Sequence, residues 1–377
     1  MPSNPAAPAP PAPAPASAPL RNAVKGRGTV WMIESRLAGT RREADDDGWG
    51  GLQQAADEAG PAPGTQIIPQ RSGSILSRND SPDIGFDHSV NPYRGCEHAC
   101  IYCYARPTHS YLDLSPGLDF ETRIVAKVDA AERLRAALAA PGYVPKQLAI
   151  GAVTDAYQPA ERRLRITRGV IEVLAEARHG FSVVTKGSLV ERDLDLIAPM
   201  AADGMAAVFV SLTTLDADLA RTMEPRAAAP HRRLRTIATL ARAGVPVGVS
   251  VSPVIPFLNE PEVERILEAA AAAGATHAFS IVLRLPWEVN PLFQQWLGAH
   301  FPLKAARIMA RVREMRGGRD NDSRFGSRMT GQGVWAELLR QRVNKAAARL
   351  GLQRRRPDLD LSQFRPPRRD PGQRELF

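Results

Sequence analysis

Short apolar runs alternate with amphipathic stretches between about residues 90 and 290. Five of these runs have the length of buried strands, at residues 146–154, 181–186, 205–213, 245–254 and 277–284. Strands covered on both faces are nearly continuous in apolar residues, which is typical of parallel sheets. The alternation of such strands with helical stretches predicts parallel β/α units.

The stretches between these runs have the period of amphipathic helices. Their apolar faces carry Leu164, Ile171, Leu174 and Ala175, then Leu234, Ile237 and Leu240, and then Val263, Ile266, Leu267 and Ala270. Gly244 and Gly274 are predicted helix stops, because glycine readily adopts the left-handed conformation that ends helices. About five or six β/α units fit before residue 290, whereas a full barrel has eight. The pattern therefore predicts a partial barrel or an open sheet.

Composition divides the chain into four parts. Residues 1–20 contain eight prolines and seven alanines, so residues 1–22 are expected to form a disordered arm. Residues 23–85 are expected to be irregular and to pack on the main domain. Residues 86–290 are the predicted core, and residues 291–377 are a predicted helical, basic extension and tail with one amphipathic helix over residues 334–350.

Charge and hydropathy limit the partners. No apolar run reaches the roughly 18 residues of a membrane span, and the N-terminus does not resemble a secretory signal, so we expect a cytoplasmic protein without a membrane partner. Residues 301–377 contain 19 Lys and Arg against 8 Asp and Glu, a net charge of +11, which leaves −2 of the total of +9 for the rest. This basic region is either a contact for polyanions or a solvated surface.

The three cysteines of the chain, Cys96, Cys100 and Cys103, all lie in the stretch NPYRGCEHACIYCYAR at residues 91–106. An odd number of clustered cysteines argues against a disulfide framework. Three thiolates in one tight loop can bind three irons of a [4Fe–4S] cluster, which leaves the fourth iron open to the amino and carboxylate groups of a methionine moiety. The alternatives are a zinc ion with His98 as fourth ligand, which lacks the usual second ligand pair, and packed cysteines without a metal.

The spacing CxxxCxxC with Tyr102 before the last cysteine resembles the radical S-adenosylmethionine (SAM) superfamily. The resemblance covers roughly residues 88–290. It implies an α/β fold, a partial (β/α)6 TIM-like barrel, with a [4Fe–4S] cluster and SAM as cofactors and an electron donor such as flavodoxin or ferredoxin as partner. The implied reaction is reductive cleavage of SAM to a 5′-deoxyadenosyl radical, which abstracts hydrogen from a substrate.

The longer string GCEHACIYCYAR is similar to the branch grouped with spore photoproduct lyase, a DNA-repair enzyme. On that resemblance, Thr154 and Asp155 match a pair near the methionine group of SAM, and Lys186 matches a lysine at the SAM carboxylate. Ser211 is expected to face the ribose, and the segment that begins MEPR makes Arg233 a second carboxylate partner. Tyr102 is also assigned to the SAM site, and we predict a catalytic, radical-carrying role for Tyr102 and Tyr104.

One position departs from the lyase pattern. Ala152 stands where the lyase has the cysteine that returns a hydrogen atom, so we do not expect repair of spore photoproduct by a thiol route. The substrate stays open at this point. A nucleic acid is one candidate, a peptide or small molecule is the alternative, and a zinc-binding nucleic-acid or interaction module is the alternative of another class.

Overall fold

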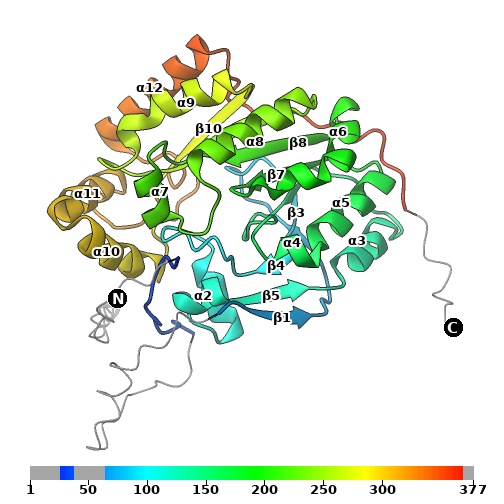
Figure 1. Ribbon diagram of the computed structural model, residues 1–377, viewed down its shortest axis with the longest axis horizontal. Helices are drawn as coiled ribbons and strands as arrows, with labels where there is room; N and C mark the ends of the chain where they lie inside the picture. The colour runs from blue at the N-terminus through cyan, green and yellow to red at the C-terminus, as the bar shows by residue number, and fades with distance from the viewer. Residues whose placement is uncertain (1–25, 38–63, 368–377) are drawn as a thin grey trace, which may run out of the picture.

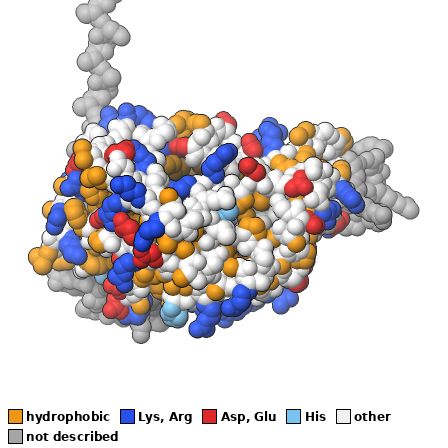
Figure 2. Space-filling view, turned by 90° about the horizontal axis from the view of Figure 1, so that it is seen from above, with side chains coloured by type: hydrophobic (Ala, Val, Ile, Leu, Met, Phe, Trp, Pro, Cys, Tyr) orange, Lys and Arg blue, Asp and Glu red, His pale blue; other side chains and the backbone are white. Residues whose placement is uncertain are grey.

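The computed structural model describes residues 26–37 and 64–367 (Figure 1). The arm predicted over residues 1–22 lies outside these residues, as does the end of the tail from residue 368. Within the described ranges, no helix is long and apolar enough to cross a membrane. Figure 2 shows acidic and basic side chains close to one another over one face of the molecule.

A seven-stranded sheet forms the centre of the molecule. Its order is β10 (His277–Val282), β9 (Val247–Val254), β8 (Ala206–Ser211), β7 (Phe181–Thr185), β6 (Leu148–Ile150), β3 (His88–Val90) and β2 (Leu76–Arg78). The six strands from β10 to β3 are parallel, and β2 is antiparallel to β3. The edge strands β10 and β2 do not pair with each other, so the sheet stays open. This arrangement confirms the predicted partial (β/α)6 barrel.

Helices cover the outer face of this sheet (Figure 1). They are α3 (Ala130–Leu138), α4 (Glu161–Leu164), α5 (Ile166–Glu176), α6 (Leu194–Ala202), α8 (Pro230–Arg242) and α9 (Val263–Ala272). Their apolar residues pack on the strand residues that face them, such as Val183, Val208 and Val249. Gly244 and Gly274 follow α8 and α9 with φ values of +76° and +98°, as predicted for helix stops.

The alternate strand positions face the inside of the partial barrel and are mostly small or polar. Successive residues of a strand point to opposite faces, and the inward positions include Ser89, Ser182, Ser211, Ser250 and Ser252. Phe209 of β8 also faces inward, where it forms a small apolar cluster with Ala207 and Leu359. Leu359 belongs to the C-terminal segment, which therefore packs against the inner face of the sheet.

A second, three-stranded sheet contains the strands that precede and follow the cysteine loop. Its order is β1 (Gln66–Gln70), β5 (Arg123–Lys127) and β4 (Tyr93–Arg94). Between β4 and β5 lie the cysteine loop, the 3-10 helix η1 (Arg106–Leu112) and α2 (Leu118–Thr122). Strands β1 and β2 lie within residues 23–85, where irregular structure was expected, and both are short strands without an apolar run.

The remaining elements lie at the ends of the barrel and between its units. They are η2 (Ser188–Asp193), α7 (Ala217–Met223), η3 (Glu260–Glu262), α10 (Val289–His300), α11 (Pro302–Met315) and α12 (Gly333–Arg349). Helix α12 agrees with the helix predicted over residues 334–350, and it packs against α9 and α11.

One helical face was predicted wrongly. Leu164 ends α4 and does not share a helix with Ile171, because Arg165 interrupts the chain with a φ of +53°. The break is stabilised by the Glu161 carboxylate, which accepts a hydrogen bond from the backbone N–H of Thr167 at 3.0 Å. A carboxylate at the first N–H groups of a helix caps it and complements its dipole. Helix α5 therefore starts anew after Arg165.

Candidate active site

The cysteine loop follows strand β4 and makes two tight turns. Cys96 and Cys100 are buried, and Cys103 is half-buried. Gly95 before the loop has a φ of +80°, and a Cβ atom there would lie 2.8 Å from the Phe120 carbonyl oxygen, so the site requires glycine. The backbone N–H of Cys96 donates to that same carbonyl at 2.9 Å. The loop is thus anchored on α2 at the point where its first cysteine begins.

Arg106 stabilises the cysteine loop through hydrogen bonds to its backbone carbonyls. Its guanidinium is fully buried and donates to the carbonyls of Cys100 (3.0 Å) and Ala99 (3.3 Å), and to two further carbonyls at residues 116 and 117. It also pairs with the Glu121 carboxylate at 2.6 Å. A buried charge is tolerated only when its partners are complete, as they are here. The sequence analysis assigned no role to this arginine, the last residue of the motif.

The segment 26–37 crosses the outside of the loop. The backbone N–H groups of Gly28 and Thr29 donate to the Glu121 carboxylate at 3.0 and 3.2 Å. A Cβ atom on Gly28 would lie 1.9 Å from the Ala99 carbonyl oxygen, so only glycine allows this approach. The segment 26–37 therefore packs against both the cysteine loop and α2.

The donor set of the loop suits a soft metal centre. Burial raises the pKa of the Cys96 and Cys100 thiols, so these groups are protonated until a metal replaces the proton. In the residues that the structure describes, no three His, Cys, Asp or Glu side chains are arranged to hold one metal ion. A [4Fe–4S] cluster binds its three cysteines through three different irons and does not require convergence on one ion.

His98 was the fourth ligand of the zinc alternative, and it has another partner. Its Nδ1 atom lies 3.1 Å from Asp155 Oδ2, an ion-pair distance although the geometry is not that of an aligned hydrogen bond. Asp155 follows strand β6, so this pair joins the cysteine loop to the carboxyl end of the sheet.

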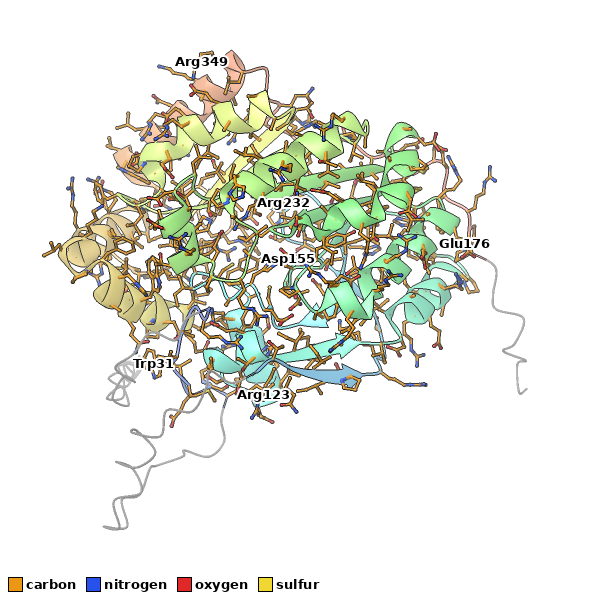
Figure 3. The ribbon with its side chains drawn as sticks, viewed as in Figure 1. Trp31, Arg123, Asp155, Glu176, Arg232 and Arg349 are labelled. Carbon is orange, nitrogen blue, oxygen red and sulfur yellow. The ribbon has the colours of Figure 1, made fainter. Side chains whose placement is uncertain are left out.

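Asp155 lies near the centre of the molecule (Figure 3) and gathers several donors. Besides His98, its carboxylate accepts hydrogen bonds from Thr185 Oγ1 at 2.7 Å and from the backbone N–H groups of Lys186 at 2.7 Å and Tyr157 at 2.9 Å. Burial alone would raise the pKa of Asp155, but His98 and these hydrogen bonds outweigh it and hold the pKa below its ordinary value. The ionised carboxylate therefore ties the end of β6 to the end of β7.

Thr154 faces the entrance of the cysteine loop. Its hydroxyl donates to the Gly95 carbonyl at 2.7 Å and accepts from Gln158 Nε2 at 3.1 Å. Gln158 is fully buried, and its Oε1 accepts from the backbone N–H of Glu97 at 2.9 Å. The sequence analysis missed Gln158, which lies four residues after Thr154 and fixes the same loop.

Lys186 presents a cation to the loop from the end of β7. Its ammonium nitrogen lies 5.7 Å from the centre of the Tyr102 ring. Its side chain is half-buried, and within the described residues it makes no ion pair. A cation in this position, beside the ring that precedes the third cysteine, is suited to a ligand carboxylate.

Tyr102 leads to a buried polar network behind the loop. Its hydroxyl donates to the Glu224 carboxylate, which also accepts from Thr213 Oγ1 at 2.8 Å and pairs with Arg233. The Arg233 guanidinium additionally donates to the Ser211 carbonyl at 3.0 Å and to the carbonyl of residue 228. Burial raises the pKa of Glu224, and Arg233 opposes this effect. Arg233 is thus bonded within the protein, and its predicted contact with SAM stays a prediction.

Tyr104 points the other way, toward the inside of the barrel. Its hydroxyl donates to the Ala152 carbonyl. The side chain is 49% exposed, yet the protein around its hydroxyl raises its pKa to about 12 through burial. Tyr104 therefore lies beside position 152, which is alanine here and is the hydrogen-donating cysteine in the lyase pattern.

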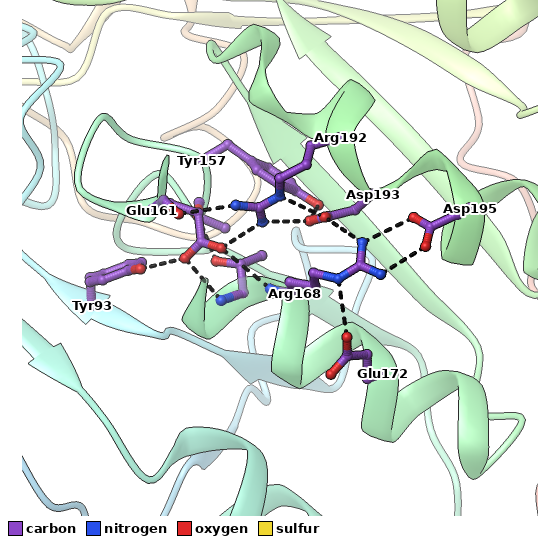
Figure 4. Close-up of polar contacts among 10 residues, drawn as sticks. Tyr93, Tyr157, Glu161, Arg168, Glu172, Arg192, Asp193 and Asp195 are labelled. Carbon is purple, nitrogen blue, oxygen red and sulfur yellow. Dashed lines mark hydrogen bonds and ion pairs between the residues drawn. The ribbon is translucent and has the colours of Figure 1, made fainter. Parts of the chain in front are cut away.

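A further network supports the loop that follows β7 (Figure 4). Arg192 pairs with Glu161 at 2.8 Å and with Asp193 at 2.7 Å, and Asp193 accepts from the Tyr157 hydroxyl at 3.1 Å. Tyr93 of β4 also donates to Glu161. These bonds connect β4, at the entrance of the cysteine loop, with the segments that follow β6 and β7.

The predicted site residues thus meet at one end of the sheet. Thr154 and Asp155 follow β6, Lys186 follows β7 and Ser211 ends β8, while the cysteine loop lies across these carboxyl ends. A sequence model of the radical SAM superfamily matches residues 90–270. The chain belongs to the radical SAM superfamily. Its cofactors are therefore a [4Fe–4S] cluster and SAM, and the protein is an enzyme of this class.

This radical SAM enzyme is similar in sequence to proteins of bacteria and archaea. An uncharacterised protein of Mycobacterium tuberculosis (strain H37Rv) is 40% identical over 234 residues, which cover 62% of this chain and 68% of that protein. An uncharacterised protein of Methanocaldococcus jannaschii is 26% identical over 178 residues, which cover 47% of this chain and 64% of that protein.

Solved structures with the same fold include spore photoproduct lyase. A variant of that enzyme with bound AdoMet and dinucleoside spore photoproduct has a TM-score of 0.56 and 15% identity, covering 79% of this chain and 87% of the other. Another variant covers 85% of this chain and 87% of the other, with a TM-score of 0.56 and 15% identity. At this identity the likeness concerns the fold.

Proposed function

We propose that this radical SAM enzyme abstracts a hydrogen atom from a nucleic acid. Cys96, Cys100 and Cys103 would hold the cluster, and SAM would lie between the cysteine loop and the carboxyl ends of β6 to β8. The observation that carries the proposal is the bonding of the loop to those ends, through Thr154 to Gly95 and Asp155 to His98. In a β/α barrel these ends form the active site.

The residues around SAM have separate tasks in this proposal. When bound, the cluster and SAM supply a reductively generated 5′-deoxyadenosyl radical, the species that removes hydrogen from a C–H bond. Lys186 binds the SAM carboxylate with its ammonium group, and Asp155 holds the backbone of Lys186 in place. Ser211, at the end of β8, faces the ribose. Tyr102 packs its ring against the Lys186 ammonium and keeps water from that side.

Two observations support a nucleic acid as substrate, the fold and the net charge of the C-terminal region, and the fold is the stronger of the two. The fold is that of spore photoproduct lyase, one structure of which contains a dinucleoside photoproduct. Residues 301–377 have a net charge of +11. However, part of this net charge is offset by acidic residues outside the region, since Arg328 pairs with Asp83, Arg342 with Glu260 and Glu264, and Arg349 with Glu268.

This pairing favours a second candidate, a small phosphorylated molecule, which would not require an extended basic surface. In either case the outcome differs from thiol-mediated repair of thymine photoproducts. Position 152 is alanine, whose methyl group has no labile hydrogen, and the three cysteines of the chain are assigned to the cluster. Radical SAM enzymes need a reductant, and flavodoxin or ferredoxin is the donor that we propose.

Isotope transfer tests the proposal. The anaerobically reconstituted enzyme is incubated with SAM, a reductant and deuterated DNA or RNA oligonucleotides, and the 5′-deoxyadenosine is analysed by mass spectrometry. The proposal predicts deuterium in that product with one of these nucleic acids, and none with Cys100→Ala. Deuterium transfer from phosphorylated small metabolites but from no nucleic acid would establish the second candidate instead.

A further inference from the structure

Two arginines on the inside of the partial barrel have no acidic partner. Arg284 lies two residues after the end of β10, and Arg356 belongs to the C-terminal segment that packs against the inner face of the sheet. Among the described residues, neither guanidinium forms an ion pair. Both side chains are half-buried, so each is a partly desolvated charge without a counter-charge.

Arg284 is poorly satisfied in the protein alone. Its Nε atom is buried and makes no hydrogen bond, and Nη1 has only the Met329 sulfur at 3.6 Å. The nearby acid, Asp83, is occupied by Arg328 with a 2.9 Å hydrogen bond and a 2.6 Å ion pair. Burial lowers the pKa of Arg284, and the charge of Arg328 lowers it further. The protein therefore leaves most of this guanidinium's donors unused.

Arg356 lies among aromatic rings. Its guanidinium carbon is 5.2 Å from the centre of the Phe209 ring, 5.5 Å from that of Phe279 and 5.7 Å from that of Phe86. Its Nη1 atom is buried without a hydrogen-bond partner, and burial lowers its pKa. The rings contact the guanidinium through cation–π interactions, and they provide no oxygen acceptor for its N–H groups.

Other buried arginines of this enzyme show the contrast. Arg106 pairs with Glu121, Arg233 pairs with Glu224, and Arg316 donates to four backbone carbonyls. An unpaired buried charge is costly in free energy, and proteins commonly compensate it. Arg284 and Arg356 are compensated in neither way, which is expected where a ligand brings the counter-charge.

Arg284 lies beside the cysteine loop. Its guanidinium is 5.6 Å from the centre of the Tyr104 ring, and the charges of Arg284 and Arg356 both oppose the rise that burial causes in the pKa of Tyr104. That hydroxyl donates to the Ala152 carbonyl, and Tyr104 directly follows the third cysteine. The inward positions of the sheet strands include small polar residues such as Ser252 of β9.

We propose that Arg284 and Arg356 form an anion subsite that binds a phosphate group of the substrate. The inference deepens the proposed function and rests on it. A phosphate suits either guanidinium, because arginine binds it through two N–H groups at once and because its negative charge supplies the missing counter-charge. The phosphate belongs either to a phosphodiester of a nucleic acid or to the phosphate ester of a small molecule.

Binding measurements on the anaerobic, cluster-loaded enzyme with SAM test the subsite at constant ionic strength. The probes are the dinucleotide dTpdT, its analogue with a neutral methylphosphonate linkage, thymidine 5′-monophosphate and inorganic phosphate. We expect Arg284→Gln and Arg356→Gln each to weaken binding of the preferred phosphate probe at least tenfold. The exposed neighbour Arg355→Gln, a matched control, should change it less than twofold.

The pattern of outcomes separates the two proposals. Preference for dTpdT over its neutral analogue identifies a nucleic-acid phosphodiester, and preference for the monophosphate identifies a small phosphate ester. If SAM binds but no probe distinguishes Arg284→Gln or Arg356→Gln from Arg355→Gln, the subsite is refuted while the proposed function stands. If the wild-type enzyme neither binds nor cleaves SAM, the proposed function fails whatever the phosphate result. Should Arg356→Gln not fold, Arg284→Gln decides alone.

Discussion

Replacing Asp155 by asparagine removes one negative charge at the junction of the cysteine loop, β6 and β7. Its oxygen Oδ1 accepts hydrogen bonds from the backbone of Tyr157 and from Thr185, and Oδ2 accepts one from the backbone of Lys186. His98 Nδ1 lies at ion-pair distance from Oδ2. The amide of Asp155→Asn has the same shape but only one accepting oxygen, so its NH2 group must face the donors of one of the two oxygens.

The magnitude follows from these contacts. At least one hydrogen bond to a charged group is lost, and two are lost if the NH2 group takes the place of Oδ1; each contributes about 1.5–3 kcal/mol. The free energy of unfolding should therefore fall by about 1.5–6 kcal/mol. Asp195→Asn is the control, because that carboxylate is 57% exposed and forms a surface ion pair with Arg168 at 2.7 Å. Such a pair contributes about 0.2–1 kcal/mol.

The effect of Asp155→Asn should also depend on pH. The folded-state pKa of Asp155 lies below its ordinary value of 3.8. A group of this kind contributes stability above its unfolded pKa and loses that contribution as the pH falls through its folded pKa. The difference between wild type and variant should therefore be complete at neutral pH and become smaller below about pH 4.

Urea unfolding followed by tryptophan fluorescence measures both quantities, at pH 7 and at several lower pH values. If Asp155→Asn destabilises the protein no more than Asp195→Asn, or if the difference does not shrink with acidification, then Asp155 does not join the loop to the sheet in the way described.

Three further predictions concern the same site. Lys186→Ala should weaken SAM affinity by about 1.5–3 kcal/mol, the scale for a hydrogen bond to a charged group. Calorimetry measures the affinity, with Lys345→Ala as a surface control, and equal affinities of the two variants would contradict the prediction. Arg233→Met leaves the Glu224 carboxylate buried without its cation, so urea unfolding should show a loss of about 3–5 kcal/mol; an unchanged stability would show that the pair is dispensable. The wild-type enzyme should give little or no thymine from dinucleotide spore photoproduct, as followed by chromatography. Multiple turnovers would refute the expectation drawn from Ala152, and a gain of repair in Ala152→Cys would identify a lyase pocket that lacks its donor.

The elements of the core were predictable because their signals are local. The run at residues 181–186 became β7, and the run at residues 205–213 became β8, each within about two residues. Strand β6 is shorter than the run at residues 146–154 suggested, since Gly151 turns the chain with a φ of +82°. Leu164 was assigned to the wrong helix because the break at Arg165 depends on Glu161, a cap that helical periodicity does not reveal.

The site was predictable only in part. The cysteine spacing is a local motif, and the family was identified from it. The groups that hold the motif are distant in sequence, however, with Tyr102 and its partner Glu224 separated by 122 positions. Glu224 stands in the segment that begins MEPR, but nothing local marks it as the partner of Tyr102 and Arg233. For Gln158 and Arg106, the only sequence signal of a role at the cysteine loop is that they lie close in the chain to Thr154 and to Cys103.

The central claim is that Cys96, Cys100 and Cys103 hold a [4Fe–4S] cluster that works with SAM. The direct measurement is iron, sulfide and zinc analysis of the anaerobically reconstituted wild type and Cys100→Ala, together with assay of 5′-deoxyadenosine after reduction in the presence of SAM. The account predicts about four irons and four sulfides per chain, and 5′-deoxyadenosine, in the wild type. It predicts a folded, colourless Cys100→Ala without either. A colourless wild type with stoichiometric zinc, and no 5′-deoxyadenosine, would contradict it.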